Sequence, residues 1–470
     1  MIDPKPRGPV LAFAMLMIAL AVMLLAGCTV GPDYKRPELD LPKDYGVTQS
    51  PAPAPEKWWT VFGDPVLDKF VDEALAANYD LKAAAARIEN ARGRLAIARA
   101  PLTPDVGVRG NVSRDRATAL GSVPIPPGFL ETTTHRLELA ASWELDFWGK
   151  YRRGSEAARA ELVASEAGRE AIRLSLIGEV VRGYFALEAL DRRLDVAQRT
   201  LSSREKTLEL QKVRLDAGMV SELEYHQVES DVLGARALVP AIRQLRIRQE
   251  GALAVLFGRS PREVMEARID HGAPGLPTVE VPAGLPSDLL LRRPDVRVAE
   301  EQLHAANARI GVARAAYFPS ITLTGFYGGE SQALGDLFTA QARTWSIAGG
   351  LLQPIFAGGQ IRGAVQAAEA STSEAEIAYR KAVANAFREV REAIAAQSNL
   401  REVAVAQRGR ESALDRTYEL ARLRYDNGAV SLFDVLDTER QLLLVRLEAI
   451  DADRDRRDAI VDLYLALGAS

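Results

Sequence analysis

The chain has 470 residues, one cysteine and a formal net charge of −4 at pH 7. A chain without a basic excess is a poor ligand for nucleic acid, so we expect no nucleic-acid partner. A lone cysteine excludes disulfide bonds and thiolate metal clusters, and the four histidines lie far apart in sequence. The chain has no P-loop, zinc-protease or Gly-x-Ser-x-Gly motif, so we expect neither a metal site nor an enzyme.

The N-terminus has the pattern of a bacterial lipoprotein signal. Lys5 and Arg7 precede an apolar stretch from Val10 to Ala26, which ends just before Cys28. We predict that residues 1–27 are a signal peptide and that a palmitate-bearing diacylglycerol is attached to the Cys28 thiol, with no other cofactor. The alternative is a transmembrane anchor with an incidental cysteine, but roughly 17 apolar residues are short for a span.

Two segments have the composition of connecting chain. Residues 28–64 are rich in proline and contain the aromatic pair Trp58-Trp59. Proline favours an extended conformation, so we predict a lipid-anchored tether over 28–64. A second segment, 259–286, is rich in proline and glycine and predicts a linker between two larger parts of the chain.

Those two parts, 65–258 and 287–470, are copies of one plan. The copies are clearest where Arg214 to Leu233 aligns without gaps with Arg424 to Leu443. A period of about 210 residues is too long for a solenoid unit and indicates a duplicated domain. Within each copy we expect the order helix, strand, loop, strand, very long helix, tip and returning helix.

The tips of the two helical hairpins are predicted near 216–221 and near 426–431. Gly218 and Gly428 allow the positive φ of a tight turn. Ser221 and Ser431 are N-cap residues for the helices that follow. Ordinary helix–turn–helix chemistry explains these four residues without any further role.

Four segments have the alternation of strands: about 105–114, 134–148, 320–330 and 344–356. The second is the clearest, because apolar residues from Leu137 to Phe147 alternate with polar ones such as Glu144. Some ten residues suffice for a tilted strand to cross a bilayer. Alternation alone also suits a soluble sandwich, but nothing else in the chain predicts a partner sheet. Four strands cannot close a barrel and open edges are not tolerated in lipid, so several copies of the chain must share one barrel.

The helices are long for a globular protein. From about Tyr151 to Leu215 there is no proline, and a helix of that length extends roughly 100 Å. Leucine recurs every seven residues from Leu187 to Leu215, which is typical of a coiled coil. Such helices suit a protein that spans a compartment. The fold class is therefore mainly α, with long coiled-coil helices and a membrane β-barrel.

The chain resembles the TolC-like outer membrane factors, in particular the NodT-type lipoproteins of RND efflux systems. The resemblance extends from Cys28 to Gly468. It rests on Cys28 with Gly31-Pro32-Asp33-Tyr34, Trp58-Trp59, Phe62, Asp64-Pro65, Leu67, Asn78-Tyr79-Asp80-Leu81, Arg293-Pro294-Asp295-Val296, Tyr317-Phe318-Pro319-Ser320 and Pro354-Ile355-Phe356.

The resemblance implies a homotrimer in the outer membrane of a Gram-negative bacterium. Each protomer would contribute four strands to a twelve-stranded barrel, and its helices would form an α-helical coiled-coil tunnel through the periplasm. The channel would be a passive exit duct for drugs and other small toxic compounds. It would work with a periplasmic adaptor and an inner-membrane RND transporter.

The resemblance also assigns roles to the hairpins. The tips would contact the adaptor through Gly218, Val220, Ser221, Gly428, Val430 and Ser431. Asp434 and Asp437 would form acidic rings at a periplasmic gate, and Tyr425 would help to tie its closed state. The alternative for the two aspartates is a solvated helix face. Val430 stands where the best-known member has an arginine of the closing contact, and Arg422 and Arg424 are candidates for its substitute.

Two other functions remain compatible with the sequence. The same fold serves as the outer-membrane outlet of type I secretion, in which an ABC exporter passes proteins through the channel. A lipoprotein without a pore, acting as a periplasmic coiled-coil scaffold, would also have long helices.

Overall fold

A computed structural model describes residues 29–42, 57–121, 125–126, 128, 130–272, 291 and 293–468. The predicted signal peptide and the predicted lipid site at Cys28 lie outside these residues. The chain divides into two compact units, each assembled from three stretches. Unit 1 comprises Met1–Glu38, Ile88–Ser165 and Ala299–Tyr379; unit 2 comprises Leu39–Arg87, Glu166–Val298 and Arg380–Ser470. Each unit takes residues from both sequence copies, so the repeats are not separate bodies.

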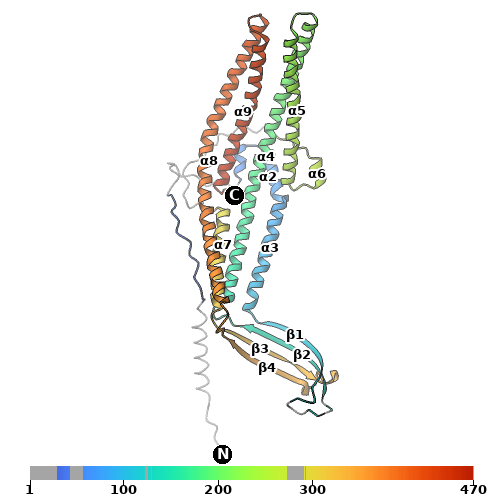
Figure 1. Cartoon of the computed structure of the whole chain (residues 1–470), viewed down its shortest axis with the longest axis vertical. Helices are drawn as coiled ribbons and strands as arrows, with labels where there is room; N and C mark the ends of the chain where they lie inside the picture. Colours follow the sequence, from blue (N-terminus) through green and yellow to red (C-terminus); the bar gives the residue numbers. More distant parts are fainter. Residues whose placement is uncertain are drawn as a thin grey trace, which may run out of the picture. The chain divides into compact units, whose positions relative to one another are not determined.

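Unit 1 contains a sheet of four antiparallel strands in the order β1-β2-β3-β4 (Figure 1). The strands are β1 (Asp105–Arg116), β2 (Glu131–Glu144), β3 (Ser320–Ser331) and β4 (Arg343–Leu352). One row of the ladder pairs Val108, Leu139, Tyr327 and Trp345, all on the apolar face. Among the described residues, the outer edges of β1 and β4 have no strand partner.

Two strands end earlier than their alternation predicts. The strand predicted over 134–148 ends at Glu144, because the Asp146 carboxylate accepts hydrogen bonds from the N–H groups of Tyr151 and Arg152 at 3.1 and 2.8 Å. These bonds cap the next helix, so the apolar pattern continues into a turn. The strand predicted over 344–356 ends at Leu352, two residues before Pro354, which has no N–H for the ladder.

The helices confirm the predicted long hairpins. They are α2 (Pro65–Ala77), α3 (Tyr79–Arg99), α4 (Lys150–Asp216), α5 (Glu222–Leu256), α6 (Pro261–Met265), α7 (Pro294–Ala315), α8 (Gln360–Asp426) and α9 (Leu432–Ala466). α4 and α8 both have 67 residues, and α5 and α9 both have 35. At 1.5 Å per residue, the longer pair extends roughly 100 Å. Within the described part of the chain, no helix is both long and apolar enough to cross a membrane.

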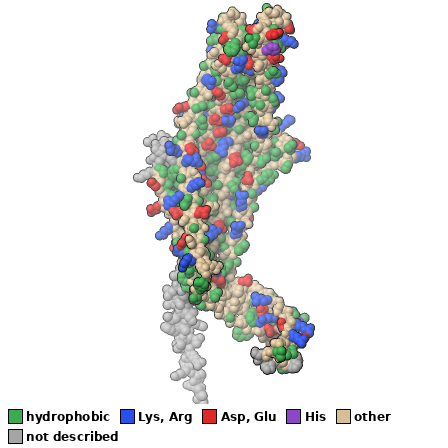
Figure 2. All heavy atoms as spheres, in the orientation of Figure 1, with side chains coloured by type: hydrophobic (Ala, Val, Ile, Leu, Met, Phe, Trp, Pro, Cys, Tyr) green, Lys and Arg blue, Asp and Glu red, His purple; other side chains and the backbone are tan. Residues whose placement is uncertain are grey.

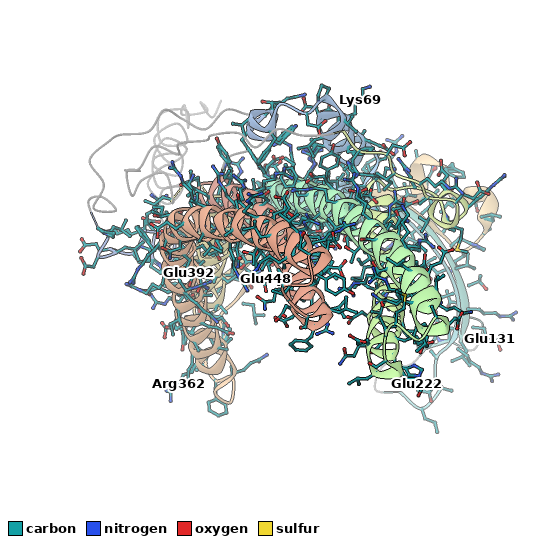
Figure 3. All side chains as sticks on the ribbon, turned by 90° about the horizontal axis from the view of Figure 1, so that it is seen from above. Lys69, Glu131, Glu222, Arg362, Glu392 and Glu448 are labelled. Atoms are coloured by element: carbon teal, nitrogen blue, oxygen red, sulfur yellow. The ribbon has the colours of Figure 1, made fainter. Side chains whose placement is uncertain are left out.

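Two leucines of the predicted heptads lie between α4 and α5. Leu194 and Leu201 pack around Ala197 of α4 and Ile242 of α5, whereas Leu208 belongs to a separate cluster nearer the tips. Seen along the helices, the α4–α5 and α8–α9 hairpins lie side by side (Figure 3). The labelled Glu222 marks the start of α5, and Glu448 lies on α9.

The start of the predicted tether is bound to unit 1 rather than free. The N–H of Val30 donates to the Trp148 carbonyl at 3.0 Å. Arg36 donates from Nε and Nη2 to the two oxygens of Glu300, at 2.6 and 2.9 Å. Proline keeps this segment extended, but side chains of α7 and α4 fix its position. Residues 29–36 of the predicted tether are therefore held against α4 and α7 by these contacts.

The end of the predicted tether is also ordered, in unit 2. Trp58 and Trp59 start a short 3-10 helix, η1 (Trp58–Phe62), and their exposed fractions are 0% and 1%. The Trp58 ring stacks on Tyr464 of α9 with centroids 5.0 Å apart. The two indoles join a core formed with α2, α4 and α9, which includes Leu67, Val71, Ile177, Val181, Tyr184, Phe185, Ile460 and Val461. Burial of large aromatic surface outweighs the extended preference of the prolines before it.

We expect Trp58→Ala to lower the free energy of unfolding by about 3–5 kcal/mol, because it removes a fully buried indole and leaves a cavity. The neighbouring Lys57→Ala is the control, since its exposed ion pair with Asp72 contributes little. Thermal unfolding followed by circular dichroism measures both. Equal melting temperatures for the two variants would show that the Trp58 indole does not stabilise the fold.

Candidate functional site at the hairpin tips

Both hairpin tips have the same backbone geometry. Gly218 and Gly428 have φ values of 65° and 71°, which are favourable only for glycine. The N–H of Met219 donates to the Arg214 carbonyl at 2.8 Å, and the N–H of Ala429 donates to the Arg424 carbonyl at 2.8 Å. These bonds close the ends of α4 and α8, as the sequence predicted for a glycine C-cap.

Each tip continues into a capping box at the start of the next helix. Ser431 Oγ accepts from the N–H of Asp434 at 3.4 Å, and the Ser431 N–H donates to the Asp434 carboxylate at 2.9 Å. Ser221 and Glu224 repeat this arrangement in the first hairpin, at 3.2 and 2.8 Å. The predicted caps are therefore present, and Asp434 has a local structural partner.

The cap also decides the charge of Asp434. The hydrogen bonds from Ser431 hold the pKa of the Asp434 carboxyl below its usual range, because they stabilise the ionised form. The side chain is exposed and stays negative at neutral pH. Asp437 is half-buried one turn further along α9, and its carboxylate accepts from Gln441 Nε2 at 2.7 Å. The two predicted gate acids thus lie on successive turns of one helix.

Tyr425, the third predicted gate residue, joins the two hairpins. Its hydroxyl accepts from Arg214 Nη1 at 3.1 Å and from Gln211 Nε2 at 3.3 Å, both on α4. Its ring packs with Leu208, Val228, Leu432 and Leu436 at the contact between the tips. The arginine that this hydroxyl binds is Arg214, the counterpart of Arg424 in the first copy.

A set of buried and partly buried charges that we did not predict joins α4, α5 and α9. Arg440 of α9 binds both carboxylate oxygens of Asp231 on α5, at 2.9 and 3.1 Å. Arg204 of α4 donates to the Asp231 carbonyl at 3.0 Å and lies 3.4 Å from Glu439 of α9. Burial raises the pKa of Glu439, and Arg204 offsets this only in part. The hairpins are therefore joined by polar contacts and not by an apolar seam alone.

The heptad pattern of α4 already indicates these polar contacts between the hairpins. Each heptad of a coiled coil has two apolar positions, and in α4 the second of these is occupied by Arg204 and by Gln211. Both side chains are almost fully buried. A polar side chain at a seam position is expensive unless a partner satisfies it. The partners come from α5, α8 and α9, which sequence spacing alone does not bring together.

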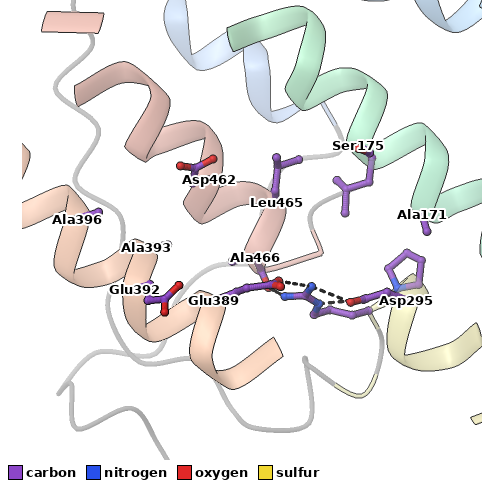
Figure 4. Close-up of a pocket in the computed structure, with 13 residues that line it drawn as sticks. Ala171, Ser175, Asp295, Glu389, Glu392, Ala393, Ala396, Asp462, Leu465 and Ala466 are labelled. Carbon is purple, nitrogen blue, oxygen red and sulfur yellow. Dashed lines mark hydrogen bonds and ion pairs between the residues drawn. The ribbon is translucent and has the colours of Figure 1, made fainter. Parts of the chain in front are cut away.

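A separate cavity of about 440 Å³ lies in unit 2, where the start of α7 and the middle of α8 meet the end of α9 (Figure 4). Its buried cation, Arg293, binds Asp295 at 2.9 Å and Glu389 at 2.7 Å, and donates to the Ala466 carbonyl at 2.8 Å. All three acceptors are protein groups, so we assign Arg293 a structural role. Among the described residues, no group of three or more His, Cys, Asp or Glu side chains is placed to hold a metal ion.

Comparison with known proteins decides the family. Residues 70–259 and 285–469 match the model of the outer membrane efflux protein family. The chain belongs to this family.

The relatives of this outer membrane efflux protein extend over almost its whole length. The probable efflux pump outer membrane protein TtgC of Pseudomonas putida KT2440 is 33% identical over 463 residues, which are 97% of this chain and 95% of TtgC. The cation efflux system protein CusC of Escherichia coli K12 is 32% identical over 458 residues, 96% of this chain and 97% of CusC. The CmeC outer membrane channel of Campylobacter jejuni matches with a TM-score of 0.90 at 28% identity, covering 94% of this chain and 95% of CmeC.

These findings confirm the resemblance to TolC-like outer membrane factors and the predicted fold class, in which each protomer contributes helices to a tunnel and strands to a barrel. They also confirm an outer-membrane location and an efflux function. The roles of individual residues at the hairpin tips stay predictions.

We expect Tyr425→Phe to favour separation of the two hairpins, because it removes both hydrogen bonds and keeps the ring. If the free energy that holds the hairpins together falls by about 1 kcal/mol, the open probability rises roughly fivefold. Single-channel recordings from planar bilayers measure it. Tyr225→Phe is the matched control, since this ring contacts His226 of its own helix. An unchanged open probability for Tyr425→Phe would remove this residue from the gate.

Proposed function

We propose that the chain is the passive outer-membrane duct of a tripartite efflux pump for drugs and other small toxic compounds. It forms a homotrimer, and a periplasmic adaptor connects it to an inner-membrane RND transporter, which supplies the energy. The chain itself has no catalytic role. The observation that carries the proposal is an open sheet with one apolar face and two edges that, in the described part of the chain, have no strand partner.

The sheet of unit 1 has the two faces that a membrane barrel needs. The face with Val108, Leu139, Leu323 and Ile347 is apolar and exposed. The opposite face carries polar residues such as Arg109, Glu138, Thr324 and Ser346, which suits a wet lumen. An exposed apolar face of this kind suits lipid, and in lipid the edges of the sheet must be paired. Three copies would supply twelve strands, enough to leave a lumen.

The hairpin tips have the surface of a docking site. Met219, Leu223 and Phe433 are exposed large apolar residues beside the two turns, with exposed fractions of 76%, 68% and 55%. Apolar side chains gathered at an exposed end indicate contact with another protein. We assign them, together with the tip residues Val220 and Val430, to the adaptor.

The second hairpin is the moving part of the gate in this proposal. Tyr425, Arg440 and Glu439 bind it to the first hairpin, and Asp434 and Asp437 would face the channel axis of the trimer. Three copies of each aspartate would make rings that attract cations and repel anions. Opening is a two-state change biased by the adaptor, because the polar contacts are either made or broken.

The relatives favour efflux over the two alternative functions. TtgC is named an efflux pump protein and CusC a cation efflux protein, so neither name points to type I protein secretion or to a scaffold without a pore. A wide wet duct needs little selectivity of its own. In this account, the cargo is chosen by the pump.

We expect Asp437→Asn to lower the preference of the channel for cations over anions, because it removes one carboxylate per protomer from the entrance. Asp437 is a cleaner test than Asp434, whose carboxylate also holds the Ser431 cap. The control is Gln227→Asn, at the matching position of the first hairpin. Reversal potentials measured in planar bilayers under a salt gradient report the selectivity. If the purified protein forms channels whose selectivity Asp437→Asn leaves intact, the gate assignment is wrong.

The lipid anchor is tested separately. We expect Cys28→Ser to abolish incorporation of labelled palmitate and to leave the precursor uncleaved, because lipoprotein processing requires the thiol. Thr29→Ser, one residue beyond, is the control and should be labelled normally. Labelling that persists in Cys28→Ser would show that residue 28 is not the acylated position.

A further inference from the structure

The apolar face of the sheet changes character toward the loops that join the strands. Its last fully apolar row contains Tyr327 and Trp345, which pair directly across β3 and β4. Beyond this row the charged strand residues of the same face are Arg114, Arg116, Arg343 and Glu131. Figure 2 shows Lys and Arg side chains gathered at this end of the sheet. Three cations and one anion leave a net positive rim.

Arg114 and Arg116 form the centre of this rim. They lie two residues apart on β1, so their side chains leave the same face about 7 Å apart. Arg114 Nη2 binds one oxygen of Glu131 at 2.8 Å, and Arg116 Nη1 lies 3.4 Å from the other oxygen. Glu131 therefore orients both guanidinium groups, while each side chain stays 74% exposed. Most of their N–H donors remain free for an outside acceptor, since each guanidinium has five.

The ladder register separates this pair from the arginines of the other face. Arg109 is on the same strand but pairs with Glu138 on the polar side, at 3.6 Å. Its side chain is also 74% exposed. The rim is thus a feature of the side that carries the apolar belt and not of the lumen side.

We propose that Arg114 and Arg116, with Arg343, bind the phosphate group of a lipid headgroup in the outer leaflet of the membrane. Aromatic residues mark the margin of the apolar belt in membrane barrels, and the basic rim follows this margin at headgroup level. The arginine fork matches phosphate geometry with two parallel hydrogen bonds. The apolar belt immediately below would hold the acyl chains, which a free phosphate ion lacks. The inference rests on the proposed insertion of the strands in the membrane.

In a closed barrel the site would lie where two copies meet. β1 and β4 are the two edges of the sheet, so β1 of one copy faces β4 of the next. Arg343 begins β4 and lies on the same face as Arg114, so the neighbouring copy adds its cation to the pair. A headgroup bound there would bridge two copies.

The test compares a phosphorylated glycolipid with its dephosphorylated form of identical acyl chains. Each is titrated into the purified full-length protein in detergent, and bound lipid is counted by native mass spectrometry. We expect wild-type protein to prefer the phosphorylated form at least about fivefold, the contribution of one basic residue at a membrane surface. The double variant R114Q/R116Q should lose this preference. R109Q removes an equally exposed arginine from the other face of the same strand and should keep it.

Three results would overturn the proposal. One is equal binding of the two lipids by wild-type protein, which needs no variant and so does not depend on the folding of one. Another is an unchanged preference in R114Q/R116Q. The third is full displacement of the lipid by equimolar inorganic phosphate, which would indicate a site for the free ion. Channel formation in bilayers is measured on the same samples, so a conducting protein without lipid preference would contradict only this inference and not the proposed function.

Discussion

The requirement that backbone N–H and C=O groups be paired in lipid governs this protein. A sheet of four strands with an exposed apolar face has two edges whose hydrogen-bonding groups need partners. Within the described residues, one chain does not supply them. Assembly follows from this, and with it a closed barrel, a lumen lined by the polar face, and a symmetric set of helices that leaves the membrane.

The two helical hairpins are joined by polar contacts as well as by apolar packing. Arg204, Gln211 and Arg440 are placed at the contacts between hairpins, where each binds a group of the other hairpin. Breaking such a contact in the interior is costly, but in an opening gate water replaces the lost partner. Polar contacts of this kind fit the proposal that the second hairpin can separate from the first.

Local rules predicted the elements well. Period-two alternation located all four strands, the glycine and serine pair located both tips, and the heptads located the contact of α4 with α5. The misses have physical causes. Alternation continues past Glu144 into the turn in which Asp146 caps α4, and a proline-rich composition does not reveal that Trp58 is buried. The partners of Tyr425 come from a helix more than two hundred residues away, and no local pattern records such a contact.

Closure of the barrel requires that β1 of one copy pairs with β4 of another, and cysteine cross-linking measures this pairing directly. One cysteine is placed on β1, between Val106 and Val112, and one on β4, between Trp345 and Leu351, and the pairs are scanned to cover the register. We expect cross-linked dimers and trimers of the assembled protein for the pairs in register. Cross-links formed within single chains, or none in any pair, would contradict it.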